Sequence, residues 1–264
     1  MSNPILLAQV TDSHLLAKTT DQLRGCNTWQ TFNAVVQEVA RCNPDGLLLT
    51  GDLAEQGETD AYGHLVDAIA PLHVPTYWLP GNHDRLDVLQ QVFQSLPVSQ
   101  GLRSVDLGTW QLILLNSVFP QAQFGEGYLS LQQLRFYLTS HPLKPTLIAL
   151  HHHPISVGID WVDQIGVQNA AEFCALIESF PQVKLVVFGH IHHEFQCRVG
   201  GVGFYGCPST CLQVMPAVGE ADERPGFRLL WLYGDGSYGT EVRRVSEVCE
   251  DRLMARKVAQ GFPP

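Results

Sequence analysis

Metal-ligating side chains follow apolar runs at five places in this chain. Each run has the composition of a short buried strand, and the polar residues come directly after its end. Because the carboxyl ends of parallel strands share one edge of a sheet, where ligands bind in open α/β folds, we expect these side chains to meet there. The five segments are Val10-Thr11-Asp12-Ser13-His14, Leu49-Thr50-Gly51-Asp52, Trp78-Leu79-Pro80-Gly81-Asn82-His83-Asp84, Ala149-Leu150-His151-His152-His153-Pro154 and Phe188-Gly189-His190-Ile191-His192.

The type and number of these side chains predict a site for two metal ions. One ion needs three or four protein ligands, so seven are enough for two cations that share a carboxylate. A set of N and O donors without thiolate suits Mn(II), Fe or Zn and does not decide among them. A water between two such cations loses its proton near neutral pH and attacks phosphorus. The seven candidate ligands are Asp12, His14, Asp52, Asn82, His151, His190 and His192.

The order and spacing of Asp-x-His, Gly-Asp, Gly-Asn-His-Asp, His-His and Gly-His-x-His resemble the calcineurin-like metallophosphoesterase superfamily. The resemblance implies an α/β fold, a four-layer αββα sandwich of two mixed β-sheets flanked by helices. It also implies two divalent or mixed-valence metal ions, Mn or Fe first and Zn next, bridged by Asp52. Asp12, His14 and His192 would complete one metal site, and Asn82, His151 and His190 the other. We also predict cofactor binding by His14, Asn82, His83 and His192.

The resemblance gives catalytic roles to three residues, Asp52, His83 and Glu55. Asp52 is the shared carboxylate. His83 points at the leaving-group oxygen in the superfamily, where an imidazolium can donate the proton that a departing alkoxide needs. Glu55 occupies a position where related phosphatases place a carboxylate that orients this histidine, so a contact between His83 and Glu55 is a hypothesis.

The triple His151-His152-His153 leaves an ambiguity, since only one imidazole can continue the strand into the metal site. Alignment by the strand end favours His151. His152 is then a group beside the metal site or on the substrate side, and His153 a loop histidine.

Further motifs over Ile5 to Val245 look like the bacterial class III 3′,5′-cyclic AMP phosphodiesterases. This implies hydrolysis of 3′,5′-cyclic AMP, or a related cyclic nucleotide, to the 5′-monophosphate. Trp29, Trp161 and Phe124 are candidate aromatic walls around the base, with plain packing as the alternative. The motifs include Gly25-Cys26-Asn27-Thr28-Trp29, Trp161-Val162-Asp163, Gln168-Asn169-Ala170, Pro208-Ser209-Thr210-Cys211-Leu212-Gln213 and Pro225-Gly226-Phe227-Arg228.

The segment after Asp52 favours a diester substrate, independently of the resemblance to the cyclic AMP phosphodiesterases. The Ser/Thr protein phosphatase branch places an Asp-Arg-Gly stretch after its Gly-Asp, whereas Gly51-Asp52 is followed by Leu53-Ala54-Glu55-Gln56-Gly57. A monoester dianion gains more from an arginine clamp than a diester monoanion does, although Arg24 could substitute for the missing arginine. Two alternatives stay open: a broad phosphodiesterase acting on glycerophosphodiesters or 2′,3′-cyclic nucleotides, and a nucleotide-binding module without turnover.

The composition of the chain limits which partners and which cellular location are expected. The chain of 264 residues has a formal net charge of −10, which repels polyanions, so we expect a small-molecule substrate and no nucleic acid. No apolar run approaches the roughly 20 residues of a membrane helix, and Met1 to Pro4 lack the features of a signal peptide. These observations predict a cytoplasmic protein without a membrane partner.

The odd number of cysteines, 7, predicts buried reduced thiols. Relatives suggest a homodimer.

Alternating apolar and amphipathic segments supply the elements that position these residues. We expect strands at 5–10, 47–49, 76–79, 146–150 and 184–188, and helices that start near Asn27, Thr59, Ser130 and Asn169. A hairpin is expected over 102–115, with short strands between 195 and 245. We predict a single domain over residues 1–246 and a C-terminal tail, a short helix and a loose end, over 247–264.

Overall fold

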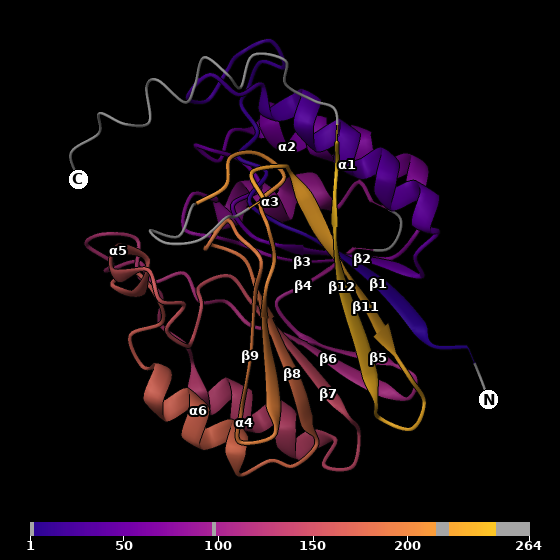
Figure 1. Cartoon of the computed structure of the whole chain (residues 1–264), viewed down its shortest axis with the longest axis vertical. Coiled ribbons are helices and arrows are strands. Elements are labelled where there is room, and N and C mark those ends of the chain that lie inside the picture. The colour runs from indigo at the N-terminus through magenta and orange to yellow at the C-terminus, as the bar shows by residue number, and fades with distance from the viewer. Residues whose placement is uncertain (1–2, 97–98, 215–221, 247–264) are drawn as a thin grey trace.

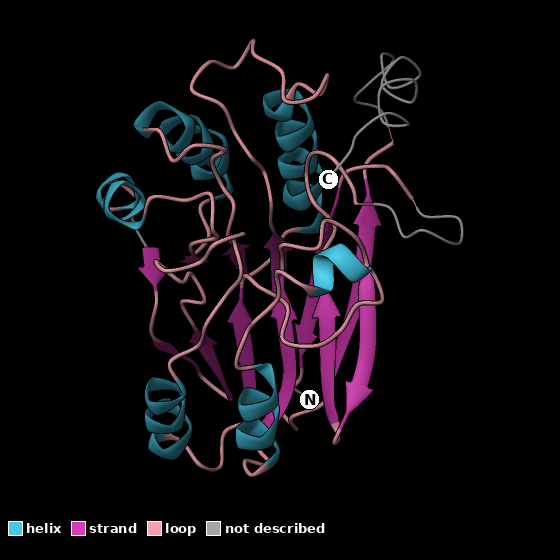
Figure 2. Cartoon of the chain, turned by 90° about the vertical axis from the view of Figure 1, so that its left-hand side faces the viewer, coloured by secondary structure: helices cyan, strands magenta, loops and turns pink. Residues whose placement is uncertain are grey.

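The computed structural model describes residues 3–96, 99–214 and 222–246. The predicted tail at 247–264 lies outside the described residues, and the division into one domain and a tail stays a prediction. The described chain forms two six-stranded mixed sheets with helices outside them. Figures 1 and 2 show the strands lying between two groups of helices. This is the predicted four-layer arrangement.

The first sheet has the strand order β12-β11-β1-β2-β3-β4. Strands β1 to β4 run parallel to one another, and β11 joins β1 in the antiparallel direction. The carboxyl ends of β1, β2 and β3 therefore lie at the same edge. The bounds are β1 Ile5–Val10, β2 Gly46–Thr50, β3 Thr76–Leu79, β4 Ser99–Gly101, β11 Gly226–Leu232 and β12 Tyr238–Arg244.

The second sheet has the order β5-β6-β7-β8-β10-β9. Its strands β6, β7, β8 and β10 are parallel, while β5 and β9 form antiparallel edges. The predicted hairpin is confirmed as β5 and β6. The bounds are β5 Ser104–Leu107, β6 Trp110–Leu114, β7 Thr146–Leu150, β8 Val183–Phe188, β9 Phe195–Val199 and β10 Val202–Gly206.

The helices cover the outer faces of the two sheets (Figure 1). Helices α1, α2 and α3 pack on the first sheet, and α4 and α6 pack on the second. Asn27 caps α1 by accepting a hydrogen bond from the Gln30 amide, and Ser130 caps α4 in the same way, as their side chains predict. The bounds are α1 Thr28–Cys42, α2 Thr59–Ile69, η1 Ala70–Leu72, α3 Leu86–Phe93, α4 Leu131–Ser140, α5 Asp160–Asp163 and α6 Ala170–Glu178.

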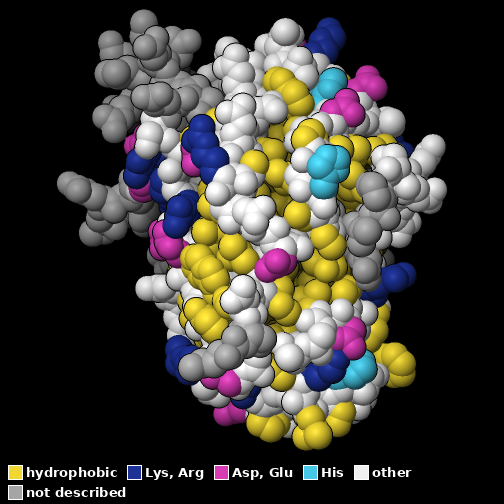
Figure 3. Space-filling model, turned by 90° about the vertical axis from the view of Figure 1, so that its right-hand side faces the viewer, with side chains coloured by type: hydrophobic (Ala, Val, Ile, Leu, Met, Phe, Trp, Pro, Cys, Tyr) yellow, Lys and Arg dark blue, Asp and Glu magenta, His cyan; other side chains and the backbone are white. Residues whose placement is uncertain are grey.

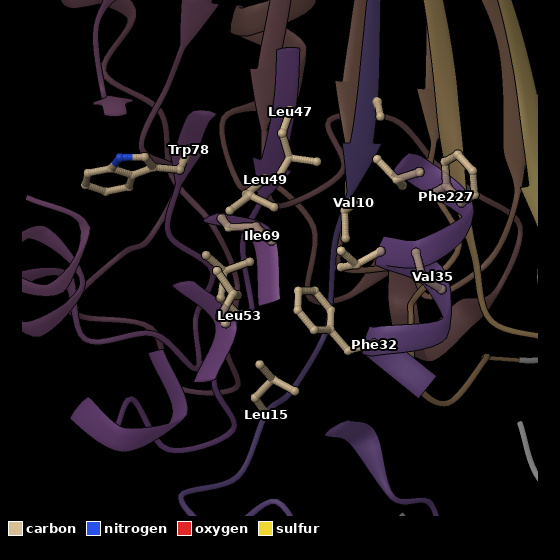
Figure 4. Close-up of a cluster of buried hydrophobic side chains, with 14 of the residues drawn as sticks. Val10, Leu15, Phe32, Val35, Leu47, Leu49, Leu53, Ile69, Trp78 and Phe227 are labelled. Atoms are coloured by element: carbon tan, nitrogen blue, oxygen red, sulfur yellow. The ribbon is translucent and has the colours of Figure 1, made fainter. Parts of the chain in front are cut away.

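The strands divide their side chains between two cores because successive residues point to opposite faces of a sheet. In β2, Leu47 and Leu49 belong to the core under the helices, whereas Leu48 belongs to the core between the sheets. Figure 4 shows Phe32 of α1 beside the strand residues of the first of these cores. In β7, Ile148 faces the helices. This burial on both faces explains why β2 and β7 read as unbroken apolar runs.

The side of the molecule in Figure 3 shows hydrophobic side chains gathered over its middle, with basic and acidic groups interspersed around them. Within the described residues, no helix is long and apolar enough to cross a membrane. The cytoplasmic location and the homodimer stay predictions. Of the described cysteines, Cys26, Cys207 and Cys211 are buried, as predicted, whereas Cys42, Cys174 and Cys197 are half-buried, so the prediction of buried thiols is confirmed only in part.

Candidate metal centre

The loops that carry the predicted ligands are held in an uncommon backbone conformation. A positive φ is disfavoured for residues other than glycine, and such strain concentrates at functional sites. After β1, and again after β8, positive φ occurs at two residues separated by one other residue, and these are the residues that carry the candidate ligands. Five predicted ligands have positive φ, namely Asp12 at 52°, His14 at 43°, Asp52 at 49°, His190 at 66° and His192 at 51°.

One group of donor atoms comes from the ends of β1, β2 and β8. The Nε2 atoms of His14 and His192 lie 3.1 Å apart. His192 Nε2 is 3.3 Å from Asp12 Oδ1, and His14 Nε2 is 3.7 Å from Asp52 Oδ2. These four residues are the ligands that the resemblance implied for one metal ion.

A second group comes from the ends of β2, β3, β7 and β8. His151 Nε2 lies 3.2 Å from Asn82 Oδ1, 3.2 Å from His190 Nδ1 and 3.3 Å from Asp52 Oδ2. These are the four residues implied for the other metal ion. The two groups share one atom, Asp52 Oδ2, while Oδ1 of the same carboxylate accepts a hydrogen bond from the His83 backbone amide at 2.9 Å.

Hydrogen bonds on the far side of the rings fix which nitrogen faces the centre. A carbonyl or carboxylate oxygen accepts, so Nδ1 of each of three histidines carries the proton: His14 on Glu55 at 2.6 Å, His151 on Thr50 at 2.8 Å and His192 on Leu212 at 2.7 Å. Their Nε2 lone pairs then converge with carboxylate oxygens. Lone pairs directed at one another repel unless a cation lies between them, so this donor set fits two metal ions. Its N and O chemistry suits Mn, Fe or Zn.

The carboxylate and the imidazoles also shift one another's protonation. Burial alone would raise the pKa of Asp52, but His151 and other nearby histidines outweigh it and bring the pKa well below its usual value. Burial alone would lower the pKa of His151, but Asp52 outweighs it and raises the pKa to about 9. Without metal, His151 therefore holds a proton at neutral pH, and a metal ion must displace it.

Metal affinity should for that reason rise with pH between pH 6 and pH 9. Below the pKa of about 9 for His151, protons compete with the metal ion for Nε2. For each proton that the metal must displace, the metal affinity falls by up to about tenfold for every pH unit below that pKa. Calorimetric titration with Mn(II) in buffers of different ionisation enthalpy counts the protons released. An affinity that does not change over this range would contradict the assignment of His151 as a ligand.

The other two histidines of the triple are engaged elsewhere. His152 donates from Nε2 to the Gly125 carbonyl at 2.9 Å, and its Nδ1 lies 2.8 Å from the Ser117 hydroxyl. His152 lies close enough to His151 and His190 to share an ion. Its Nε2–H donates to a carbonyl and its Nδ1 can accept from the Ser117 hydroxyl, so in this arrangement both nitrogens are engaged in hydrogen bonds. His153 is also buried, with Nε2 at 3.6 Å from Asp163. His153 lies in the loop after β7, as expected, and its side chain is buried there.

His83 lies at the edge of the centre with a side chain 38% exposed. Its Nδ1 donates to the backbone carbonyl of Glu55 at 2.9 Å, and the Glu55 carboxylate is 3.6 Å away. The hypothesised contact is therefore made mainly through the backbone, and the carboxylate makes its short bond to His14. Burial would raise the pKa of Glu55, but the bond to His14 outweighs it and lowers the pKa.

A Glu55→Gln variant separates these two contacts. The backbone contact to His83 remains, whereas His14 loses an ionised partner that keeps its ring oriented and basic. We expect the Mn(II) concentration for half-maximal activity to rise by about 10-fold to 100-fold, with a smaller change in kcat at saturating metal. Glu58→Gln, close in sequence but outside both donor groups, is the control. A loss of kcat that excess metal cannot restore would show that Glu55 acts mainly through His83.

Sequence reasoning missed Asp84 as an organiser of the site. This half-buried carboxylate accepts hydrogen bonds from the backbone amides of Leu53, Ala54 and Gly81 at 3.0, 3.1 and 2.8 Å, and from the Tyr62 hydroxyl at 2.9 Å. It thereby joins the loop of Asp52 to the loop of Asn82. Burial, and then the nearby Asp52, raise the pKa of Asp84 to about 6. Its position three residues after a glycine, in a turn, is the sequence signal that was available.

Gly81 allows these two loops to touch. A Cβ at this position would overlap Oδ1 and the backbone nitrogen of Asp52. We expect Gly81→Ala to lower activity by about 100-fold, because displacement of reacting groups by about 1 Å has effects of that size. Gly63→Ala in α2 is the matched control, since a Cβ there meets nothing within 4 Å and alanine favours the helix. Equal activity of the two variants would contradict this account of the loops.

A cleft opens onto the centre. It is lined by candidate ligands from both donor groups, by Glu55 and by His83. The other lining residues, which form its outer walls, are Leu23, Arg24, Phe124, Trp161, Ile165, Cys211, Leu212, Gln213 and Val214. The cleft thus combines a centre of nitrogen and oxygen donors with outer walls that are largely apolar.

Comparisons with known proteins agree with this geometry. A 3′,5′-cyclic-nucleotide phosphodiesterase of Nostoc sp. is 43% identical over 252 residues, which cover 92% of this chain and 93% of the relative. The 3′,5′-cyclic adenosine monophosphate phosphodiesterase CpdA of Escherichia coli is 36% identical over 264 residues, with 98% of this chain and 95% of the relative covered.

Solved structures share the fold. A dimetal phosphatase from Danio rerio has a TM-score of 0.67 at 13% identity and covers 93% of this chain and 98% of its own. A purple acid phosphatase from yellow lupin has a TM-score of 0.69 at 16% identity, covering 93% of this chain and 52% of its own. The family model of the calcineurin-like phosphoesterases matches residues 5–194, which contain all seven candidate ligands. The chain belongs to the calcineurin-like phosphoesterase family.

Proposed function

We propose that this protein hydrolyses 3′,5′-cyclic AMP, or a related cyclic nucleotide, to the 5′-monophosphate. The observation that carries the proposal is the convergence of two donor groups on one oxygen of Asp52, with His83 at the edge of the same cleft. The similarity to relatives named as cyclic-nucleotide phosphodiesterases, over nine-tenths of the chain, supports the choice of substrate.

Asp12, His14, Asp52 and His192 would hold one metal ion, and Asp52, Asn82, His151 and His190 the other. When bound, two such ions supply an activated water and neutralise charge on the phosphate oxygens. We infer Mn or Fe as the metals, with Zn as the next candidate. The neutral amide of Asn82 leaves this centre more positive than a further carboxylate would, which favours an anionic substrate.

His83 is positioned for the proton transfer that ring opening needs. Conversion of 3′,5′-cyclic AMP to 5′-AMP breaks the bond between phosphorus and O3′, so an alkoxide leaves. The backbone carbonyl of Glu55 holds Nδ1–H of His83 at 2.9 Å, and this leaves Nε2 on the opposite edge of the ring to donate a proton to O3′. His83 is thus the general acid, and Glu55 acts as a positioning residue.

Arg24 bears on the choice between diester and monoester. The chain lacks an arginine after Gly51-Asp52, yet Arg24 reaches the cleft from another loop, as the sequence allowed. With Arg24 in the cleft, the missing arginine after Gly51-Asp52 no longer separates a diester from a monoester. The choice of a cyclic diester therefore rests on the similarity to the relatives named as cyclic-nucleotide phosphodiesterases.

A substrate panel tests the proposal. Protein loaded with Mn(II) is assayed with 3′,5′-cyclic AMP, 2′,3′-cyclic AMP, glycerophosphocholine and 5′-AMP, and kcat/KM is compared. We expect 3′,5′-cyclic AMP to exceed the others by at least about tenfold and to yield 5′-AMP. Equal values for the three diesters would point to a broad phosphodiesterase. A stoichiometric nucleotide complex that stays unhydrolysed would point to a binding module.

A further inference from the structure

Two large aromatic side chains stand exposed on the outer wall of the catalytic cleft. Trp161 is 56% exposed and Phe124 is 80% exposed, and both line the cleft that contains the metal-ligand candidates. Burial of large apolar side chains stabilises a fold, so two of them left open at one cleft forgo that stabilisation. Isolated exposed hydrophobic residues need no explanation, but a pair beside a polar centre suggests a ligand.

The backbone under Trp161 is held firmly although its side chain is open. Asp163 accepts hydrogen bonds from the Ser156 hydroxyl at 2.6 Å and from the Val157 amide at 2.8 Å, which closes the turn before α5. Val162 is buried in the core beneath this helix. The short helix α5 therefore presents Trp161 on an anchored support.

Phe124 is supported in a similar way by a buried carboxylate. Glu126 accepts hydrogen bonds from the backbone amides of Gln123 at 3.0 Å and Phe124 at 2.8 Å, and from the side chain of Gln168 at 3.1 Å. Gln168 belongs to the segment that follows α5. The backbones of this segment and of the Phe124 loop also pair, between Gly127 and Gly166 at 3.0 Å. The supports of Phe124 and Trp161 are thus joined to each other.

Trp29, the third aromatic candidate from the sequence, has a different environment. It lies at the start of α1 and packs against the core under the helices, with its ring 5.5 Å from that of His64. It does not line the cleft described above. Plain packing therefore accounts for Trp29, whereas it does not account for Trp161 and Phe124.

We propose that Trp161 and Phe124 form the subsite for the nucleobase of the substrate, an inference that rests on the proposed function. The metal centre receives the phosphate, and the aromatic wall lies in the same cleft, where a flat ring attached through a ribose can stack. Stacking of a base on an aromatic side chain tolerates any base, because every base has a π-face. This subsite recognises nucleotides as a class and contributes little to the choice between adenine and guanine.

The first arm of the test is kinetic. Trp161→Ala and Phe124→Ala are compared with Phe136→Ala, a 67% exposed aromatic on α4 that lies outside the cleft. We expect KM for 3′,5′-cyclic AMP to rise by about 5-fold to 100-fold in the cleft variants, with kcat reduced less, and no change in the control. Unchanged KM in both cleft variants would overturn the subsite.

The second arm needs no turnover and separates this inference from the proposed function. Binding of 5′-AMP and of ribose 5-phosphate, which lacks the base, is measured by calorimetry on the Mn(II)-loaded protein. We expect the unmodified protein to bind 5′-AMP more tightly than ribose 5-phosphate. In Trp161→Ala and Phe124→Ala this difference should disappear, while the affinity for ribose 5-phosphate stays the same. Such a result supports the subsite even if cyclic AMP is not hydrolysed. Equal binding of the two compounds to the unmodified protein would overturn the subsite even if cyclic AMP is hydrolysed.

Discussion

Replacing Asp52 with Asn is expected to abolish hydrolysis almost completely. Oδ2 of Asp52 lies 3.7 Å from His14 Nε2 and 3.3 Å from His151 Nε2, so it is the atom common to both donor groups. The amide removes a negative charge that two cations would share. A loss of several kcal/mol of transition-state stabilisation corresponds to on the order of 10³-fold or more in rate.

The variant should also bind less metal. The metal content of the dialysed protein is expected to fall from about two ions per chain to one or none, because the centre loses the negative charge that lies between the two donor groups. Asp106→Asn, an exposed carboxylate paired with Lys144, is the matched control and should retain both metals and full activity. An Asp52→Asn protein with two tightly held ions and activity within tenfold of the unmodified chain would refute the shared-carboxylate assignment.

His83→Gln should produce the second large effect, and its size should depend on the leaving group. With 3′,5′-cyclic AMP an alkoxide must be protonated, so kcat is expected to fall by about 10²-fold to 10⁴-fold. With bis(4-nitrophenyl) phosphate the leaving group departs without a proton, and the loss should be less than about tenfold. We expect two metal ions per chain to remain, because both donor groups stay complete without His83, although a ring nitrogen of His83 lies within 4.8 Å of donor atoms of His14 and Asp52.

His141→Gln, an exposed histidine at the end of α4, controls for the substitution itself. Steady-state rates for both substrates, measured at saturating Mn(II), give the comparison. If His83→Gln slowed the cyclic nucleotide and the aryl diester equally, His83 would bind the phosphate in both reactions and would not be the acid.

The sequence was sufficient to predict that the candidate ligands lie close together. Asp12, Asp52 and His151 follow apolar runs at once or within a few residues. These runs become β1 and β2 of the first sheet and β7 of the second, so the candidate ligands meet where the carboxyl ends of the two sheets come together and not at the edge of one sheet. The motif order then led to the superfamily and hence to the two mixed sheets. Asn27 and Ser130 marked helix starts because their side chains can accept from free amides in the first turn.

Other features depend on contacts between distant segments and could not be predicted. The nitrogen of His192 that faces the centre is set by the carbonyl of Leu212, 20 residues away. Glu55 pairs with His14 across 41 residues, which spacing could not distinguish from a bond to His83. The helices α3 and α5 were also missed, because 8 and 4 residues give little periodic signal.

The central claim is that this chain opens a cyclic nucleotide with a two-metal centre, and a metal titration of the reaction tests it most directly. Metal-free protein is titrated with Mn(II), and release of 5′-AMP from 3′,5′-cyclic AMP is measured against metal bound per chain, with Asn82→Ala alongside. We predict that activity requires close to two bound ions, disappears with a chelator and is absent in the variant. Full activity with one ion, or hydrolysis that persists after complete metal removal, would contradict the account.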